Sequence, residues 1–209
     1  MMSRAPLLDP FYPIVPDSDW LARLAPLGIK TVQLRIKCQP ELRIREEISR
    51  SLHIARRFGC QLIVNDFWRE AISLGADFIH LGQEDLASAD LPAIRTAGIR
   101  VGISTHDEAE RSIAMAGQPA YIALGPVYET KLKAMKWAPQ GLERVRTWKA
   151  AIGAVPLVAI GGLTPERAPR VLAAGADSLA VITDFASHAD PEARVREWVA
   201  WSKDHNHEA

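Results

Sequence analysis

Short runs of β-branched and other apolar residues alternate along the chain with longer segments in which apolar residues recur every three to four positions. The short runs predict eight strands, at Tyr12–Val15, Thr31–Leu34, Gln61–Val64, Asp77–His80, Arg100–Ile103, Tyr121–Leu124, Leu157–Ile160 and Ser178–Ile182. The intervening segments predict helices, such as the one with its apolar stripe at Ile44, Ile48, Leu52 and Ala55. The later strands are almost continuously apolar, which is typical of parallel strands buried on both faces.

Turn residues support this division. Gln39-Pro40 and Thr164-Pro165-Glu166 each predict the start of a helix, and Gly59 and Gly175 each predict a helix end. A regular alternation of strands and helices predicts an α/β fold with a parallel sheet.

A (β/α)8 barrel and an open doubly wound sheet both satisfy this alternation. Polar residues follow at least six of the predicted strands. In a barrel the carboxyl ends of all strands converge on one site, whereas an open sheet forms one crevice where the strand order reverses. We therefore predict a single TIM-barrel domain over residues 1–209, a length that one α/β barrel can occupy.

The composition of the chain argues against nucleic acid and membranes as partners. The chain carries 25 Lys and Arg residues against 25 Asp and Glu residues, which gives no electrostatic reason to expect nucleic acid. Apolar stretches such as Val155–Gly162 are far shorter than the roughly 18 residues of a membrane span. Cys38 and Cys60 form no disulfide or metal pattern, and the amino end does not read as a signal peptide. We expect a soluble, cytoplasmic protein with no membrane partner, and homo-oligomer formation stays open.

The second predicted strand ends in polar residues that alternate. Gln33, Arg35 and Lys37 are two positions apart, so an extended backbone directs them to one face. Two cations on such a face suit an anion such as a diphosphate, with arginine as a fork and lysine as a point charge. An exposed edge strand would show the same alternation, and this alternative stays open.

Carboxylates follow the third and fourth strands. Asp66 and Asp85 together are a suitable set for Mg²⁺, which takes one or two carboxylates together with phosphate and water. Each could equally cap a helix. Ser104, after the fifth strand, could bind a phosphate oxygen or cap the next helix. The role of His80 at the end of the fourth strand stays open.

The last three strands are followed by segments suited to phosphate. Residues 125–136 form a long loop with three lysines, which predicts a lid that brings Lys133 to a leaving group, although a solvated basic loop has the same composition. Gly162 and the pair Ile182-Thr183 follow the seventh and eighth strands, where barrels often bind phosphate. A plain tight turn would also need glycine at position 162.

Taken together and in order, these motifs resemble the thiamine phosphate synthase family. The residues that carry the resemblance are Gln33–Lys37, Val64–Asp66, His80–Leu86, Gly102–His106, Gly125–Thr130 and Ala159–Leu163. The likeness extends over nearly the whole chain, and Ala138–Leu142 resembles the proteobacterial branch.

The resemblance implies a TIM-barrel transferase with Mg²⁺ as its cofactor. It would move the pyrimidinylmethyl group of 4-amino-2-methyl-5-hydroxymethylpyrimidine diphosphate to 4-methyl-5-(2-phosphoethyl)thiazole by a dissociative mechanism, giving thiamine phosphate and pyrophosphate. Asp66 and Asp85 would hold the metal. The pyrimidine diphosphate would contact Gln33, Leu34, Arg35, Ile36, Lys37, Asn65, Ser104 and Lys133, of which Arg35, Lys37, Ser104 and Lys133 would assist catalysis. The thiazole phosphate would contact Thr130, Lys131, Leu132, Gly162, Ile182 and Thr183.

The lid departs from the family pattern. Where the family has Pro-Thr-x-Thr-Lys, this chain reads Glu129-Thr130-Lys131-Leu132-Lys133. Leu132 removes one hydroxyl contact to the thiazole phosphate, worth about 1.5–3 kcal/mol if charge-assisted, and Lys131 could replace it. Two alternatives follow, namely an enzyme similar to thiazole tautomerases and a non-catalytic protein that binds a phosphate ligand.

Overall fold

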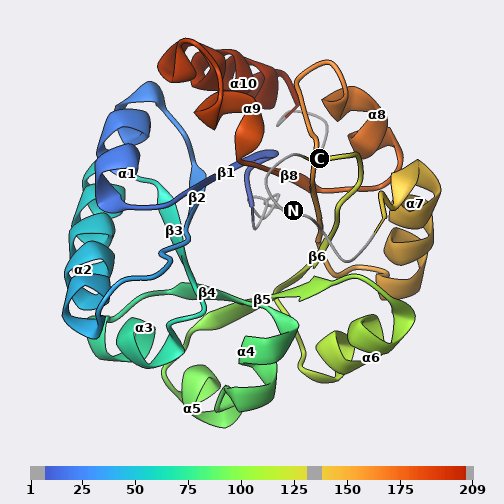
Figure 1. The fold of residues 1–209 in the computed structure, drawn as a ribbon. Helices are drawn as coiled ribbons and strands as arrows, with labels where there is room; N and C mark the ends of the chain where they lie inside the picture. Colours follow the sequence, from blue (N-terminus) through green and yellow to red (C-terminus); the bar gives the residue numbers. More distant parts are fainter. Residues whose placement is uncertain (1–7, 131–137, 206–209) are drawn as a thin grey trace, which may run out of the picture.

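The protein folds as a closed barrel of parallel strands, here in a computed structural model that describes residues 8–130 and 138–205. Within these ranges each strand pairs with its sequence neighbours, and the last pairs with the first (Figure 1). The strands are β1 Phe11–Val15, β2 Thr31–Leu34, β3 Gln61–Asn65, β4 Phe78–Leu81, β5 Arg100–Thr105, β6 Tyr121–Leu124, β7 Leu157–Ile160 and β8 Ser178–Val181. The predicted TIM barrel is confirmed, and the open doubly wound sheet is wrong.

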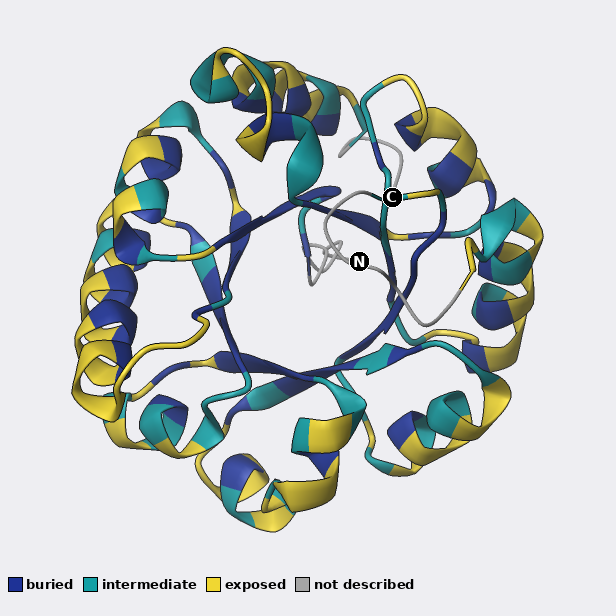
Figure 2. Ribbon diagram, in the orientation of Figure 1, coloured by how far each residue is buried: buried dark blue, intermediate teal, exposed yellow. Residues whose placement is uncertain are grey.

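Helices surround the barrel and turn their buried sides toward it (Figures 1 and 2). They are α1 Ser18–Leu24, the 3₁₀ helix η1 Ala25–Leu27, α2 Glu41–Phe58, α3 Trp68–Leu74, α4 Gln83–Ser88, α5 Leu91–Thr96, α6 Glu108–Ala116, α7 Gly141–Ile152, α8 Ala168–Ala173, α9 Thr183–Ala186 and α10 Pro191–His205. The predicted stripe on α2 is buried at Ile44, Ile48, Leu52 and Ala55. Within the described ranges, no helix is both long and apolar enough to cross a membrane.

The core has two layers because successive strand residues point to opposite faces of the barrel wall. On β1, Phe11 and Val15 belong to the outer layer between the strands and the helices, whereas Tyr12 and Ile14 belong to the inner layer. The inner layer contains Leu8, Tyr12, Ile14, Ile63, Phe78, Tyr121, Ala123, Val158 and Ala180. Its two tyrosines are the polar members of an otherwise apolar layer.

Several predicted boundaries shift by a few residues. The fourth strand was expected at Asp77–His80 but runs from Phe78 to Leu81, and the eighth ends at Val181 instead of Ile182. The helix expected to begin at Thr164 begins at Ala168, because Thr164 first forms a turn whose carbonyl accepts from the N–H of Arg167. The edge-strand interpretation of the second strand is wrong, since β2 pairs with β1 on one side and with β3 on the other.

Candidate functional site

Asp66 occupies an unusual backbone conformation directly after β3. Its φ is +68°, in the left-handed region that non-glycine residues rarely adopt. Its N–H donates to the carbonyl of His80 on β4 at 2.9 Å, and its own carbonyl accepts from the N–H of Trp68 at 2.7 Å. The strained residue is therefore fixed by the neighbouring strand and by the start of α3, which is typical of functional positions.

The carboxyl groups of Asp66 and Asp85 lie close enough to share a hydrogen bond. The pKa of Asp66 is raised from 3.8 to about 6 by burial and, next in size, by the negative charge of Asp85, while the charge of Arg35 and the N–H of Gly82 act in the opposite direction. Asn65 on β3 donates its side-chain amide to Asp66. Two carboxylates that repel each other at neutral pH are stabilised by a cation between them.

The chemistry of this pair suits Mg²⁺. The ion prefers oxygen ligands and keeps several positions for water and substrate phosphate. In the part of the chain that the structure describes, no three His, Cys, Asp or Glu side chains form a metal cluster. A cation at Asp66 and Asp85 would thus take its remaining ligands from water or from a bound phosphate.

The helix-capping interpretation is wrong for these aspartates. The N-cap residues of α3 and α4 are Phe67 and Gly82, and neither helix start has a side-chain capping hydrogen bond. The same holds for Ser104, because Asp107 caps α6 by accepting from the N–H of Glu110 at 2.9 Å. These three side chains are therefore available for another function.

A chain of hydrogen bonds crosses the barrel interior and ends at Ser104. Gln33 Nε2 donates to the hydroxyl of Tyr12, and the hydroxyls of Tyr12 and Tyr121 are hydrogen-bonded, each at 2.8 Å. The imidazole of His80 contacts the Tyr121 hydroxyl through Nδ1 and Ser104 Oγ through Nε2, again at 2.8 Å each. Five strands thus contribute one side chain each. We call Gln33, Tyr12, Tyr121, His80 and Ser104 the interior chain.

Burial keeps the interior chain uncharged. Burial, together with a smaller contribution from the positive charge of Arg35, lowers the pKa of His80 to about 3. It also raises the pKa values of Tyr12 and Tyr121 well above their ordinary values. Gly102 on β5 makes room for the chain, since a Cβ atom at this position would overlap the ring of Tyr121.

The candidate residues from Gln33 to Lys37, at the end of β2 and just beyond it, differ in their surroundings. Gln33 is buried in the interior chain, and the charge of Arg35 acts on both Asp66 and His80. Leu34 and Ile36 are buried in the outer core layer, so a substrate would meet only their backbone. Lys37 is exposed and lies beyond the end of β2.

A second group of candidate residues lies across the barrel mouth, after β6, β7 and β8. Gly161 and Gly162 have φ values of +102° and +64°, and a Cβ at Gly162 would overlap the carbonyl of Glu129. The N–H groups of Val127 and Tyr128 donate to the carbonyls of Ile160 and Gly161 at 2.8 and 3.0 Å. Glycine is therefore required where the loop after β6 lies against the loop after β7.

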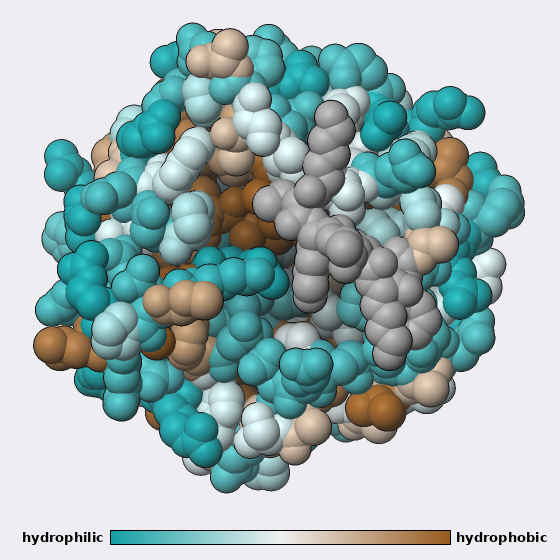
Figure 3. All heavy atoms as spheres, in the orientation of Figure 1, coloured by the Kyte–Doolittle hydropathy of each residue, from teal (hydrophilic) through white to brown (hydrophobic). Residues whose placement is uncertain are grey.

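The remaining candidates complete this second group. Thr130 is half-buried at the edge of the described range, and Ile182 and Thr183 are half-buried at the junction of β8 and α9. Lys131, Leu132 and Lys133 lie outside the described residues. Beside the grey atoms in Figure 3, apolar residues lie deeper than the hydrophilic residues that border them.

Arg194 on α10 connects α9 with the loop after β7. It donates to Asp184 at 2.8 and 3.0 Å and lies 3.4 Å from Glu166 in the loop after β7. Asp184 also accepts from the indole of Trp198 at 2.7 Å. α9 lies beside α10 (Figure 1), so the carboxylate next to Thr183 is neutralised from the α10 side. Sequence reasoning did not single out Arg194, Tyr12 or Tyr121.

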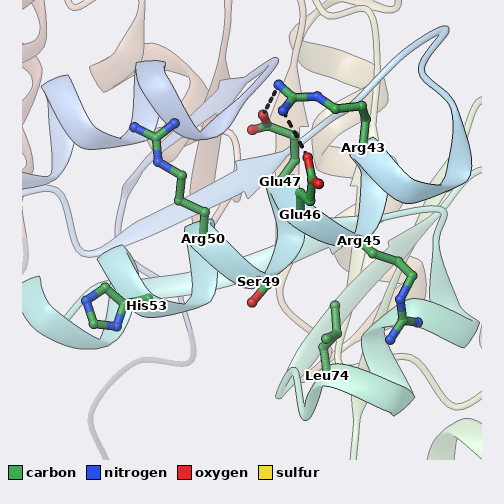
Figure 4. A pocket seen from close by; sticks show the side chains of 8 residues that line it. All are labelled: Arg43, Arg45, Glu46, Glu47, Ser49, Arg50, His53 and Leu74. Atoms are coloured by element: carbon green, nitrogen blue, oxygen red, sulfur yellow. Dashed lines mark hydrogen bonds and ion pairs between the residues drawn. The ribbon is translucent and has the colours of Figure 1, made fainter.

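A groove of about 760 Å³ lies on the outer side of α2, away from these groups (Figure 4). It is lined by Arg43, Arg45, Glu46, Glu47, Ser49, Arg50, His53 and Leu74. Arg43 pairs with Glu46 and Glu47 at 3.0 and 3.1 Å, and Arg50 pairs with Asp19 at 2.7 Å. Glu47 is buried, but the other members of these pairs are exposed, and exposed ion pairs indicate a solvated helix surface instead of a reaction site.

Comparison with known proteins gives consistent matches. A family profile described as thiamine monophosphate synthase matches residues 12–185. A thiamine-phosphate synthase from Rhizobium etli is 60% identical over 193 residues, covering 92% of this chain and 95% of that protein. The protein of the same name from Escherichia coli strain K12 is 43% identical over 185 residues, which is 88% of either chain.

Among solved structures, a thiamine phosphate pyrophosphorylase from Pyrococcus furiosus superposes with a TM-score of 0.80 at 24% identity, covering 93% of this chain and 95% of that one. That likeness supports the fold alone. The sequence matches go further, because they combine high identity with nearly complete coverage. They show that the chain is a transferase that belongs to the thiamine monophosphate synthase family.

Proposed function

We propose that this chain is a thiamine phosphate synthase. It would transfer the pyrimidinylmethyl group of 4-amino-2-methyl-5-hydroxymethylpyrimidine diphosphate to 4-methyl-5-(2-phosphoethyl)thiazole, releasing pyrophosphate. The observation that carries the proposal is the grouping of Asp66, Asp85 and Arg35 after β2, β3 and β4, on the same barrel mouth as the glycine turn after β7. Relatives at up to 60% identity are named for this activity.

The residues that follow β2, β3 and β4, namely Arg35, Lys37, Asp66 and Asp85, suit a departing pyrophosphate. In the proposed reaction the C–O bond to the diphosphate breaks, and its electron pair leaves on oxygen. Arg35 would supply positive charge for that oxygen, with further charge from Lys37 and, as the sequence predicts, from Lys133. Asp66 and Asp85 would hold Mg²⁺, which neutralises phosphate charge when it is bound. Such stabilisation is strong because the groups are already in place before the bond breaks.

The second group suits the thiazole phosphate. The turn at Gly161 and Gly162 would bring backbone N–H groups to the phosphate, and Thr130 and Thr183 would supply hydroxyls. The thiazole nitrogen then forms the C–N bond to the pyrimidine methylene, so no protein nucleophile is needed. The pKa of His80 is lowered to about 3, so its imidazole is a weak base, which agrees with a reaction that has no protein base. Arg194 prevents Asp184 from repelling the incoming phosphate.

The test is a complete reaction. The purified protein is mixed with both substrates and Mg²⁺, and thiamine phosphate and pyrophosphate are quantified together. Equal yields of the two products, both lost in Asp66→Ala and in Asp85→Ala, are the expected result. Binding of the thiazole phosphate without any product would instead indicate a ligand-binding protein, and rearrangement of a thiazole precursor alone would indicate a tautomerase.

A further inference from the structure

The interior chain has one end that is buried and one that reaches the barrel mouth. Gln33, Tyr12, Tyr121 and His80 are each at most 7% exposed, whereas Ser104 is half-buried. We propose that the four buried members orient a chain of hydrogen bonds in one direction, so that the hydroxyl of Ser104 is held as a donor to an anionic diphosphate. Under the proposed function, on which this inference rests, the four are positioning residues for Ser104.

The direction follows from the donors and acceptors of each group. The side-chain NH₂ group of Gln33 can only donate hydrogen bonds, so the Tyr12 oxygen accepts from Gln33 Nε2. The proton of Tyr12 then needs an acceptor, and the one found among the described residues is the Tyr121 oxygen. Tyr121 in turn donates to His80 Nδ1, which leaves His80 Nε2–H to donate to Ser104 Oγ. Since Ser104 Oγ accepts from His80, its own proton is directed elsewhere.

The opposite direction leaves a buried group unsatisfied. If Ser104 donated to His80, then Nδ1–H would donate to Tyr121 and Tyr121 would donate to Tyr12. The Tyr12 oxygen would accept two hydrogen bonds, and its proton would have no acceptor among the described residues, although this side chain is only 1% exposed. Burying an unpaired donor is unfavourable, so the first direction is the stable one.

Ser104 is placed where such a donor is useful. Gln83, at the start of α4, donates to the Ser104 carbonyl at 2.6 Å and thereby connects Ser104 to the helix that carries Asp85. The charge of Arg35 acts on His80, the direct partner of Ser104. In the proposed direction Ser104 presents a proton to the phosphate oxygens. In the other direction it would present lone pairs, which repel an anion.

The direction can be measured without substrate. Nitrogen-15 NMR of the histidine-labelled full chain distinguishes a protonated ring nitrogen from an unprotonated one, and His80→Gln assigns the signal among the six histidines. We expect neutral His80 with its proton on Nε2. Tyr128→Phe, which removes the hydroxyl of the third tyrosine of the chain, should leave this signal unchanged. A proton on Nδ1, or a doubly protonated ring, would overturn the proposal even if the protein makes thiamine phosphate.

A double-mutant cycle tests the role of the chain in binding. Tyr121→Phe should lower kcat/KM for the pyrimidine diphosphate by about tenfold, as expected when one hydrogen bond to a charged group is weakened. The KM for the thiazole phosphate should stay unchanged. In a Ser104→Ala background, Tyr121→Phe should have almost no further effect. An equal loss in both backgrounds would mean that Tyr121 does not act through Ser104, and the proposal would be wrong.

Two further measurements cover the cases in which Tyr121→Phe does not fold or the protein makes no product. If Tyr121→Phe does not fold, Tyr12→Phe removes the preceding donor and is expected to give the same pattern. If the protein makes no thiamine phosphate, binding of Mg²⁺ and inorganic pyrophosphate replaces kcat/KM, and Ser104→Ala should weaken it about tenfold. Unchanged pyrophosphate binding in Ser104→Ala would contradict the donor role independently of turnover.

Discussion

Asp85→Asn is expected to stabilise the metal-free protein at neutral pH while it removes catalysis. The pKa of Asp66 is raised from 3.8 to about 6, so the folded protein binds a proton here more tightly than the unfolded chain does. The stability that this proton gives is fully present below about pH 4 and is lost as the pH rises through about 6. At neutral pH the two carboxylates therefore oppose folding, and asparagine removes one of the charges with almost no change in shape.

The expected stabilisation by Asp85→Asn is modest. A shift of two pKa units corresponds to about 3 kcal/mol. Burial is the largest cause and remains in the variant, and solvent screens a carboxyl that is only half-buried, so the part due to Asp85 is about 1 kcal/mol. For a chain of 209 residues this raises Tm by roughly 2–4 °C.

The assay is thermal unfolding in a chelator at about pH 8 and about pH 4, the two sides of the transition. Glu84→Gln is the matched control, because it removes an exposed carboxylate one position away on the same helix. Asp85→Asn should raise Tm at the higher pH only, and Mg²⁺ should stabilise the native sequence but not the variant. A lower Tm for Asp85→Asn at the higher pH, or equal stabilisation of both proteins by Mg²⁺, would refute the reasoning.

Three other substitutions test separate parts of the molecule. Arg194→Met leaves Asp184 without its cation, and we expect a loss of about 3 kcal/mol in a urea titration together with a higher KM for the thiazole phosphate alone. Gly102→Ala introduces a Cβ that overlaps Tyr121, so it should cost about 1–3 kcal/mol in the same titration, and an unchanged midpoint would contradict the close contact. Leu132→Thr restores a hydroxyl in the lid and should lower the KM for the thiazole phosphate, whereas no change would indicate that a neighbouring residue already supplies the contact.

The barrel and the proximity of the two carboxylates could be predicted from the sequence, because both follow from the order of strands and helices along the chain. Apolar runs mark the strands, and the carboxyl ends of adjacent parallel strands meet, so residues that follow β3 and β4 are expected to lie side by side. The proximity of Asp66 and Asp85 is a direct result of this rule. The left-handed backbone of Asp66 is not, since it depends on a hydrogen bond to the carbonyl of His80.

The interior chain and Arg194 depend instead on contacts between distant positions. Tyr12 and Tyr121 are 109 residues apart, and each lies within an apolar strand where an aromatic residue is ordinarily part of the core. Nothing in the spacing shows that their hydroxyls meet. The available signal was Gln33, an amide on the inward face of a buried strand, because such a group needs a polar partner inside the barrel.

The two halves of the barrel mouth differ in how their charge is arranged. Around Asp66 the charge of Arg35 lowers the pKa of the carboxyl, but that pKa stays above its ordinary value, and a bound metal would relieve the repulsion from Asp85. Around Thr183 the nearby carboxylate of Asp184 is already paired with Arg194 and bonded to Trp198. The proposed site, with a metal on one side and a bare phosphate on the other, would require this difference. Variants of the first half should therefore respond to Mg²⁺ concentration, whereas variants of the second half should respond only to the thiazole phosphate.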